Sequence, residues 1–266
     1  MPLFPLKGQA LSTSITCTAG TGFLLFGYDQ GVFSGLLSLP SFSDTFQNPS
    51  PTVKGHIDLG CLIGALSMIF VGDKLGRKRS IRLGCLIVIV GAILQTSSFS
   101  LVQMIIARII TGVGTVANTT AIPLWQSELA KALHRGRLIG FSLVILVFGL
   151  IIANLVNLLF SYTDTNKSIT WRFPLAFQCV FTLMTLALLS CIPESPRWLM
   201  LQDRSDEART VIARLLAWSE DDPVVREDHA EIDRSIQQDR EIQKPRMSEI
   251  FRNGSPADIP SHRSWS

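Results

Sequence analysis

The chain has 266 residues, of which 47% are hydrophobic and 17% are charged, and its mean hydropathy is +0.33. This composition is too apolar for most soluble domains, and the net charge of +3 is too small to favour nucleic-acid binding. Residues 1–192 hold only 19 of the 45 charged residues, so a membrane block followed by a soluble tail is predicted.

Six apolar segments are long enough to cross a bilayer, which requires about 20 residues of helix. They are predicted at residues 13–37, 54–72, 80–98, 101–124, 138–160 and 171–192. We therefore expect an all-α membrane protein with four parts: a cytoplasmic amino terminus (1–12), a six-helix transmembrane bundle (13–192), cytoplasmic amphipathic helices (193–252) and a disordered tail (253–266).

Basic residues between the predicted spans set the orientation of the bundle. Five lie between the second and third spans or at the start of the third, and three lie between the fourth and fifth: Lys74, Arg77, Lys78, Arg79, Arg82, Lys131, Arg135 and Arg137. The positive-inside rule places both termini in the cytoplasm of a multi-pass protein, which we expect in the plasma membrane. On the outer side, Asn166-Lys-Ser168 is an acceptor sequence for N-glycosylation.

The chain carries no sequence pattern typical of a cofactor, metal or enzyme site. Its five cysteines occur singly in apolar segments, without a neighbouring histidine, and are predicted to be small buried hydrophobic residues. Its four histidines fall outside the predicted spans or, for His56, at the edge of the second, and the spans contain no histidine cluster, Ser–Lys dyad or His–Glu metal motif. We expect no cofactor, no bound metal and no enzymatic activity.

Few charged residues lie well inside the predicted spans, and the two that stand out are Asp29 in the first and Arg108 in the fourth. A charge in the membrane interior is costly unless it meets a partner or water, so the two are expected to pair across the bundle. The pair has two interpretations. It is either a carboxylate that takes up and releases a proton during transport, or a structural ion pair that fixes the register of the helices.

The segment Gly72-Asp73-Lys74-Leu75-Gly76-Arg77-Lys78-Arg79 joins the second and third spans. Its glycines allow a tight turn, and its aspartate is suited to cap or to salt-bridge a helix end. Taken alone, this pattern is equally typical of an ordinary basic loop that obeys the orientation rule.

This segment, however, resembles the signature loop of the major facilitator superfamily. Further strings resemble the sugar porter branch of that superfamily, especially fungal hexose and polyol transporters. They are Gly27-Tyr-Asp-Gln-Gly31, Arg108-Ile-Ile-Thr-Gly-Val-Gly114, Glu128 with Arg135-Gly-Arg137, Trp171-Arg-Phe-Pro174 and Pro193-Glu-Ser-Pro-Arg-Trp198. The resemblance covers about residues 15–252 and implies transport of a sugar or polyol by proton symport.

The resemblance also implies roles for particular residues. Asp29 would bind the proton and Arg108 would pair with it. A cytoplasmic salt-bridge network that latches the two transporter halves in the outward-facing state would comprise Asp73, Arg77, Glu128, Arg137, Glu194 and Arg197. Many sugar porters use a glutamine in the fifth span to bind sugar, but Leu150 stands here, which leaves Gln30, Asn154 and Asn157 as candidate sugar contacts.

Members of this family have twelve spans in two related halves, and the chain resembles the first half alone. Because alternating access moves one half against the other, we expect a truncated gene product or a fragment that lacks its second half. The alternative is a half-size membrane protein that pairs with a second copy, or with another transporter half, as a sensor or regulatory subunit.

Overall fold

The structure is a computed structural model that describes residues 6–36, 42, 45–46, 76–129, 135–162 and 168–252. The predicted second span (54–72), Asp73, Asn166 and the tail (253–266) lie outside the described residues. Within the described ranges every regular element is a helix, and five helices are long and apolar enough to cross a membrane. They are α1 (Gly8–Leu36), α4 (Arg77–Thr96), α5 (Leu101–Leu129), α6 (Arg135–Ser161) and α7 (Ile169–Ser190). Their ends lie within about five residues of the corresponding predicted spans.

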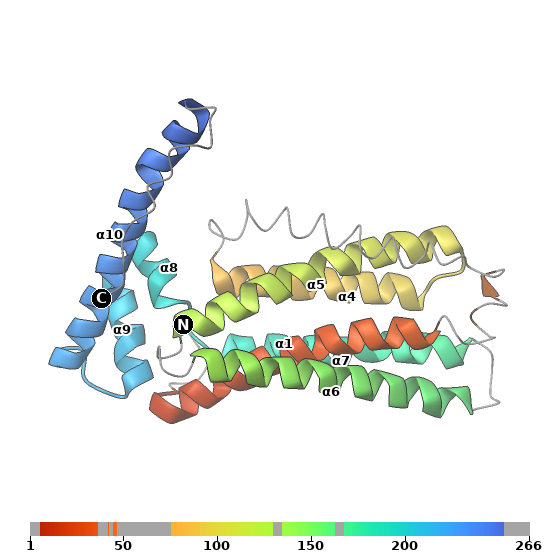
Figure 1. Cartoon of the computed structure of the whole chain (residues 1–266). Coiled ribbons are helices and arrows are strands. Elements are labelled where there is room, and N and C mark those ends of the chain that lie inside the picture. The colour runs from red at the N-terminus through yellow and green to blue at the C-terminus, as the bar shows by residue number, and fades with distance from the viewer. Residues whose placement is uncertain are drawn as a thin grey trace.

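The spanning helices form two groups that lie along each other (Figure 1). Helices α4 and α5 pack side by side, and α1 packs closely on α6 with α7 beside them. Glycines make the close approach of α1 to α6 possible: a Cβ atom at Gly27 would lie 1.9 Å from the carbonyl oxygen of Leu146. Gly31 and Gly35 follow at four-residue spacing on the same face of α1, and a Cβ at either would also collide with α6.

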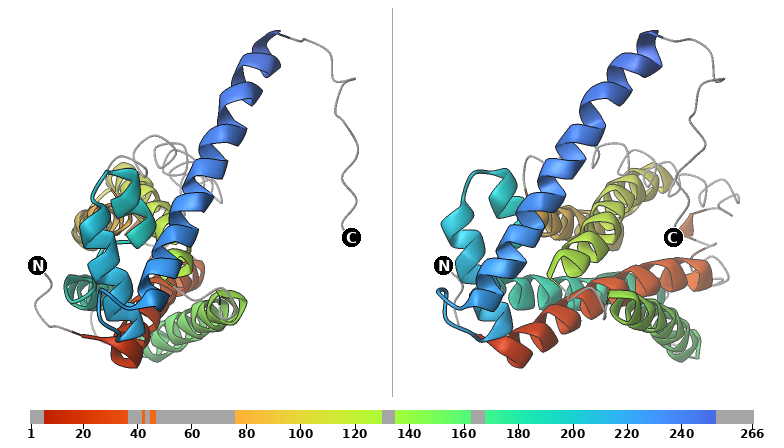
Figure 2. Two further views of the ribbon diagram at one scale, coloured as in Figure 1. Left: turned by 90° about the vertical axis from the view of Figure 1, so that its left-hand side faces the viewer. Right: turned by 60° about the vertical axis from the view of Figure 1, so that its left-hand side comes forward.

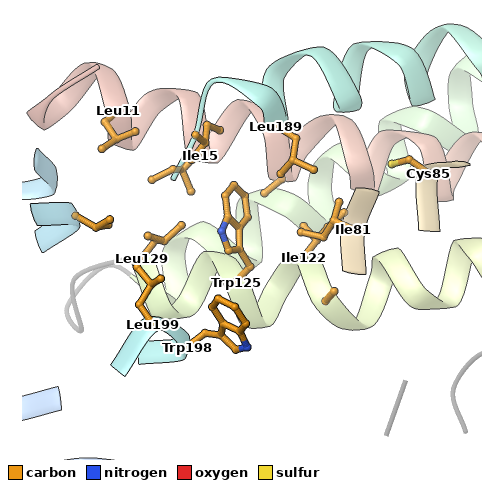
Figure 3. Packing of buried hydrophobic residues seen from close by; sticks show 14 of the residues in the cluster. Leu11, Ile15, Ile81, Cys85, Ile122, Trp125, Leu129, Leu189, Trp198 and Leu199 are labelled. Carbon is orange, nitrogen blue, oxygen red and sulfur yellow. The ribbon is translucent and has the colours of Figure 1, made fainter. Parts of the chain in front are cut away.

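Two hydrophobic clusters fill the interior of the bundle. One lies where α1, α5 and α7 meet the helices that follow the bundle, and Figure 3 shows Trp125 pointing from α5 towards Ile15 of α1 and Leu189 of α7. The other lies towards the opposite ends of the helices, around Tyr28 and Trp171. The outward faces of the helices remain apolar, as expected for surfaces that face lipid or a second half.

Three helices follow the bundle: α8 (Pro196–Leu201), α9 (Ser205–Leu216) and α10 (Pro223–Arg252). The hydroxyl of Ser195 caps α8 by accepting a hydrogen bond of 3.3 Å from the amide of Trp198, and the Trp198 side chain is buried in the adjacent cluster. These helices gather at one end of the bundle, and α10 extends away from it (Figure 2).

Amphipathic helices are predicted over residues 193–252, and α10, with 30 residues, takes up half of that segment. The reason is local. Pro223 occupies the first helical position, where a missing amide proton is harmless, and residues 224–244 contain no glycine or proline to end the helix.

Candidate functional site

Asp29 and Arg108 meet in the interior of the bundle. Nη1 of Arg108 on α5 lies 3.0 Å from Oδ1 of Asp29 on α1, and the two side chains are 1% and 4% exposed. The guanidinium also lies over the ring of Phe33, 3.9 Å from its centroid. An ion pair with this burial is stable only because each charge neutralises the other, since either one alone would be left in a low-dielectric interior.

Other side chains hold α1 in place around this pair. The hydroxyl of Tyr28 donates a hydrogen bond of 2.8 Å to the carbonyl of Pro174, and its ring packs against Phe177 and Phe181 of α7. One face of α1 is thus fixed on α7. Asp29, the next residue along the chain, reaches α5 instead.

A second group of polar contacts lies where α4 begins. Nη2 of Arg77 is 3.3 Å from Oε1 of Glu128, and both side chains are buried, with 9% and 6% exposure. Oε1 of Glu194 accepts a hydrogen bond of 2.9 Å from the backbone amide of Lys78, so its carboxylate lies at the amino end of α4, where the helix dipole favours negative charge.

Lys78 completes this group from the same helix end. Its ammonium donates to the backbone carbonyls of Ile192 and Ser190 at the carboxyl end of α7, where a cation is favourable. No contact of Lys78 is predicted from the sequence, because its contact with α7 depends on which helices are neighbours.

The remaining latch candidates are arranged differently. Arg197 pairs with Asp239 and donates to the hydroxyl of Ser235, both on α10. Arg137 is exposed near the start of α6 and makes no ion pair within the described ranges. The structure therefore brings Arg77 and Glu128 together, places Glu194 at the same helix end, and directs Arg197 to α10.

The three candidate sugar contacts also differ in environment. Gln30 and Asn154 are exposed, and the Asn154 amide donates to the Leu150 carbonyl of its own helix at 2.8 Å. Asn157 is buried and donates to the backbone carbonyls of Val32 at 3.0 Å and Gly31 at 3.5 Å on α1. Its amide nitrogen thus joins α6 to α1.

A bundle of membrane-length helices with a buried ion pair between two of them, and a charged cluster where α4 meets α5 and α7, is the architecture of one half of a secondary transporter. Residues 14–256 match the family model described as "Sugar (and other) transporter". The chain therefore belongs to this family, the sugar porters of the major facilitator superfamily.

Relatives of known sequence and structure are similar over most of the chain. It is 40% identical over 247 residues to the MFS-type transporter oryC of Aspergillus oryzae, and 41% identical over 229 residues to the sugar transporter STL1 of Saccharomyces cerevisiae. These alignments cover 90% and 79% of this chain but 46% and 40% of the relatives, so the chain spans about half the length of the curated relatives it matches.

The fold is also similar to a solved transporter structure. The proton:xylose symporter XylE, bound to 6-bromo-6-deoxy-D-glucose, superposes with a TM-score of 0.81 at 25% sequence identity. The superposition covers 93% of this chain and 57% of XylE. The predicted fold, half of a major facilitator transporter followed by additional helices, is therefore confirmed.

Proposed function

We propose that the chain forms the amino-terminal half of a transporter that moves a sugar or polyol together with a proton, and that Asp29 is the proton-binding group. The observation that carries this proposal is the buried ion pair between Asp29 and Arg108. Such a pair between two spanning helices is costly to keep for structure alone, and ionisable residues at this depth typically mark ion pathways.

The ion pair suits a transport cycle because protonation changes its charge. A neutral Asp29 would release Arg108, weaken the link between α1 and α5, and allow these helices to shift. Deprotonation would restore the pair. XylE, to which this fold is similar, is described as a proton:xylose symporter, and this supports coupling to protons.

The Arg77–Glu128 pair supports a second part of the proposal. We assign six residues to a cytoplasmic salt-bridge network that latches the two transporter halves in the outward-facing state. They are Arg77, Glu128, Glu194, Asp73, Arg137 and Arg197. Such a network acts as a bistable element, because its charges are either paired or exposed to water. Both termini would then lie in the cytoplasm and the protein in the plasma membrane.

The sugar contacts proposed for this half are Gln30, Asn154 and Asn157. Gly31 on α1 packs against Leu150 and Ala153 on α6, so the exposed Gln30 and Asn154 lie at similar depth on neighbouring helices. Two amides at one depth are suited to bind the hydroxyl groups of a sugar or polyol.

Alternating access requires two halves that rock around a central site, so the proposal includes a second six-helix half. Sequencing the transcript beyond the codon for Gly254 tests whether the same gene supplies it. Cross-linking of the purified protein tests the alternative, in which a second copy or another transporter half joins this chain as a regulatory complex.

The proton role is tested with the native gene product that contains this chain, reconstituted in proteoliposomes. Addition of a transported hexose or polyol should make the external solution more alkaline, and Asp29→Asn should abolish this signal, because an amide cannot take up the proton. Asp206→Asn, an exposed carboxylate on α9, is the matched control and should leave the signal intact. An unchanged signal in Asp29→Asn contradicts the proposal.

A further inference from the structure

Helix α7 carries a buried polar side chain that takes no part in the Asp29–Arg108 ion pair or in the hydrogen bonds between helices described above. Gln178 is fully buried, yet its Oε1 and Nε2 atoms make no hydrogen bond with the described residues. Two other buried side chains also have atoms without a partner: Oε1 of Gln95 on α4, and Nε and Nη2 of Arg108 on α5. Buried polar atoms without partners are rare in native proteins and call for an explanation.

The contacts between α1 and α7 fix the depth of Gln178. The hydroxyl of Thr185 donates to that of Thr21 at 3.1 Å, and the two helices run antiparallel. Seven residues further along α1 and seven back along α7, Tyr28 and Gln178 lie at the same depth. Asp29, which follows Tyr28, is therefore in the same layer of the bundle as Gln178.

The contacts of α4 place Gln95 in this layer as well. Arg172 near the start of α7 donates to the carbonyl of Ser98 just beyond α4, and Lys78 reaches Ile192 at the other end, so α4 and α7 are antiparallel neighbours along their length. In that register Gln178 lies opposite Ala92, less than one helical turn from Gln95.

Arg108 reaches the same layer from α5. The Gln95 amide donates to the hydroxyl of Thr111, and Thr111 lies one turn from Arg108 on α5. Four helices thus each contribute a buried polar side chain at one depth: Asp29, Gln95, Arg108 and Gln178.

The unpartnered atoms in this layer are chemically complementary. Nε and Nη2 of Arg108 are donors that lack acceptors, whereas Oε1 of Gln95 and Oε1 of Gln178 are acceptors that lack donors. Two amide oxygens can satisfy a guanidinium directly or through a bridging water, but they cannot neutralise its charge. The two amide oxygens are therefore suited to accept hydrogen bonds from the Arg108 guanidinium once its carboxylate partner has been protonated.

We propose that Gln178, together with Gln95, is a positioning residue that receives the guanidinium of Arg108 when Asp29 is protonated. This inference rests on the proposed proton role of Asp29. The two amide oxygens lower the free-energy cost of separating the ion pair. Arg108 exchanges the Asp29 carboxylate for these acceptors and does not remain buried without any acceptor.

Few other charges are close enough to share this role. Residues 138–161 of α6, 173–190 of α7 and 83–96 of α4 contain no charged residue, and Arg108 is the only charged residue between 101 and 127 of α5. The titratable groups without formal charge on these stretches are Cys85 and Cys179, and α1 adds Cys17 and Tyr28. Within these segments, the partner of Arg108 after protonation of Asp29 is therefore either a neutral group or Asp29 itself.

Two variants of Gln178 in the reconstituted native gene product test this assignment through the pH profile of transport. Gln178→Met keeps the size of the side chain and removes the acceptor, so protonation of Asp29 becomes harder and half-maximal transport shifts by about one pH unit towards acid. Gln178→Glu supplies a carboxylate that competes for Arg108, so the profile shifts in the opposite direction.

Thr182→Val, one turn away on the same buried face, is the control. The Thr182 hydroxyl already donates to the carbonyl of Gln178 within its own helix, so its loss should leave the profile in place. A purely structural role for Gln178 predicts no shift in either variant, and shifts of the same sign also overturn the inference. If Asp29→Asn abolishes proton movement while Gln178→Met and Gln178→Glu leave the profile unmoved, only this inference fails. If Asp29→Asn has no effect, the proposed function fails first.

Discussion

Asn157 on α6 donates a hydrogen bond of 3.0 Å to the backbone carbonyl of Val32 on α1, next to Gly35, where a Cβ atom would lie 2.1 Å from the Asn157 amide nitrogen. The asparagine therefore fills the space that the glycine leaves, and its side chain links α6 to the backbone of α1. In a bilayer such a polar contact stabilises helix association, since lipid offers no competing partner.

The first prediction concerns this link. Asn157→Leu should lower the free energy of unfolding by about 1 kcal/mol, because it removes an interhelical hydrogen bond and introduces a branched side chain beside Gly35. Thermal unfolding of the purified protein in detergent measures the effect.

Asn154→Leu is the matched control, because the Asn154 amide is exposed and bonds only within its own helix. Its stability should stay close to that of the unmodified protein. If the two variants unfolded alike, the hydrogen bond to α1 would have no measurable role in stability.

The second prediction concerns the glycine face of α1. Gly27→Ala should destabilise the protein by about 1–3 kcal/mol, because the new methyl group would meet the backbone oxygen of Leu146, which cannot rotate away. Gly140→Ala on α6 should instead stabilise the protein. A Cβ atom there meets nothing within 4 Å, and alanine favours the helix over glycine by roughly 1 kcal/mol.

Denaturation of the two alanine variants side by side checks both signs. Equal stability of Gly27→Ala and the unmodified protein would show that α1 and α6 separate enough to admit the methyl group. That result would contradict the close packing of α1 on α6 described above.

The third prediction concerns the buried pair of Arg77 and Glu128. Arg77→Gln and Glu128→Gln should each destabilise the protein by about 3 kcal/mol, because each neutralises one member of a buried ion pair. The double variant should cost less than the sum of the single variants, since neither charge then remains.

A double-mutant cycle measures this coupling energy. The exposed pair of Arg204 and Glu207, whose side chains are 44% and 57% exposed, provides the comparison and should show a coupling below about 1 kcal/mol. Additive effects at Arg77 and Glu128 would mean that the two side chains do not interact.

The sequence predicts the fold well because apolar length and motif order are properties of the chain alone. It also identifies Asp29 and Arg108 as partners, since two isolated charges within a membrane have few alternatives. These predictions depend on composition and spacing, which need no knowledge of how the helices are rotated.

Side-chain pairing between helices is harder to predict, because it depends on rotation and register. Arg197 is assigned by resemblance to the latch, whereas the structure pairs it with Asp239, 42 positions further along the chain. Asn157 is assigned to sugar binding, and its bond to α1 becomes visible only once Gly35 is seen beside it. Gln178 is not predicted as a site residue, because a single glutamine in an apolar helix belongs to no recognisable motif.

One contact near the start of the described chain links the amphipathic helices to the bundle. The guanidinium of Arg214 on α9 donates to the carbonyl of Leu6, two residues before α1 begins, and Gly8 packs closely against Ala217 just after α9. Helix α9 is therefore fastened to the beginning of α1, the same helix that carries Asp29. If the proposed protonation of Asp29 tilted α1, these contacts would carry α9 with it, so that a proton bound within the bilayer would displace a helix at the end of the bundle.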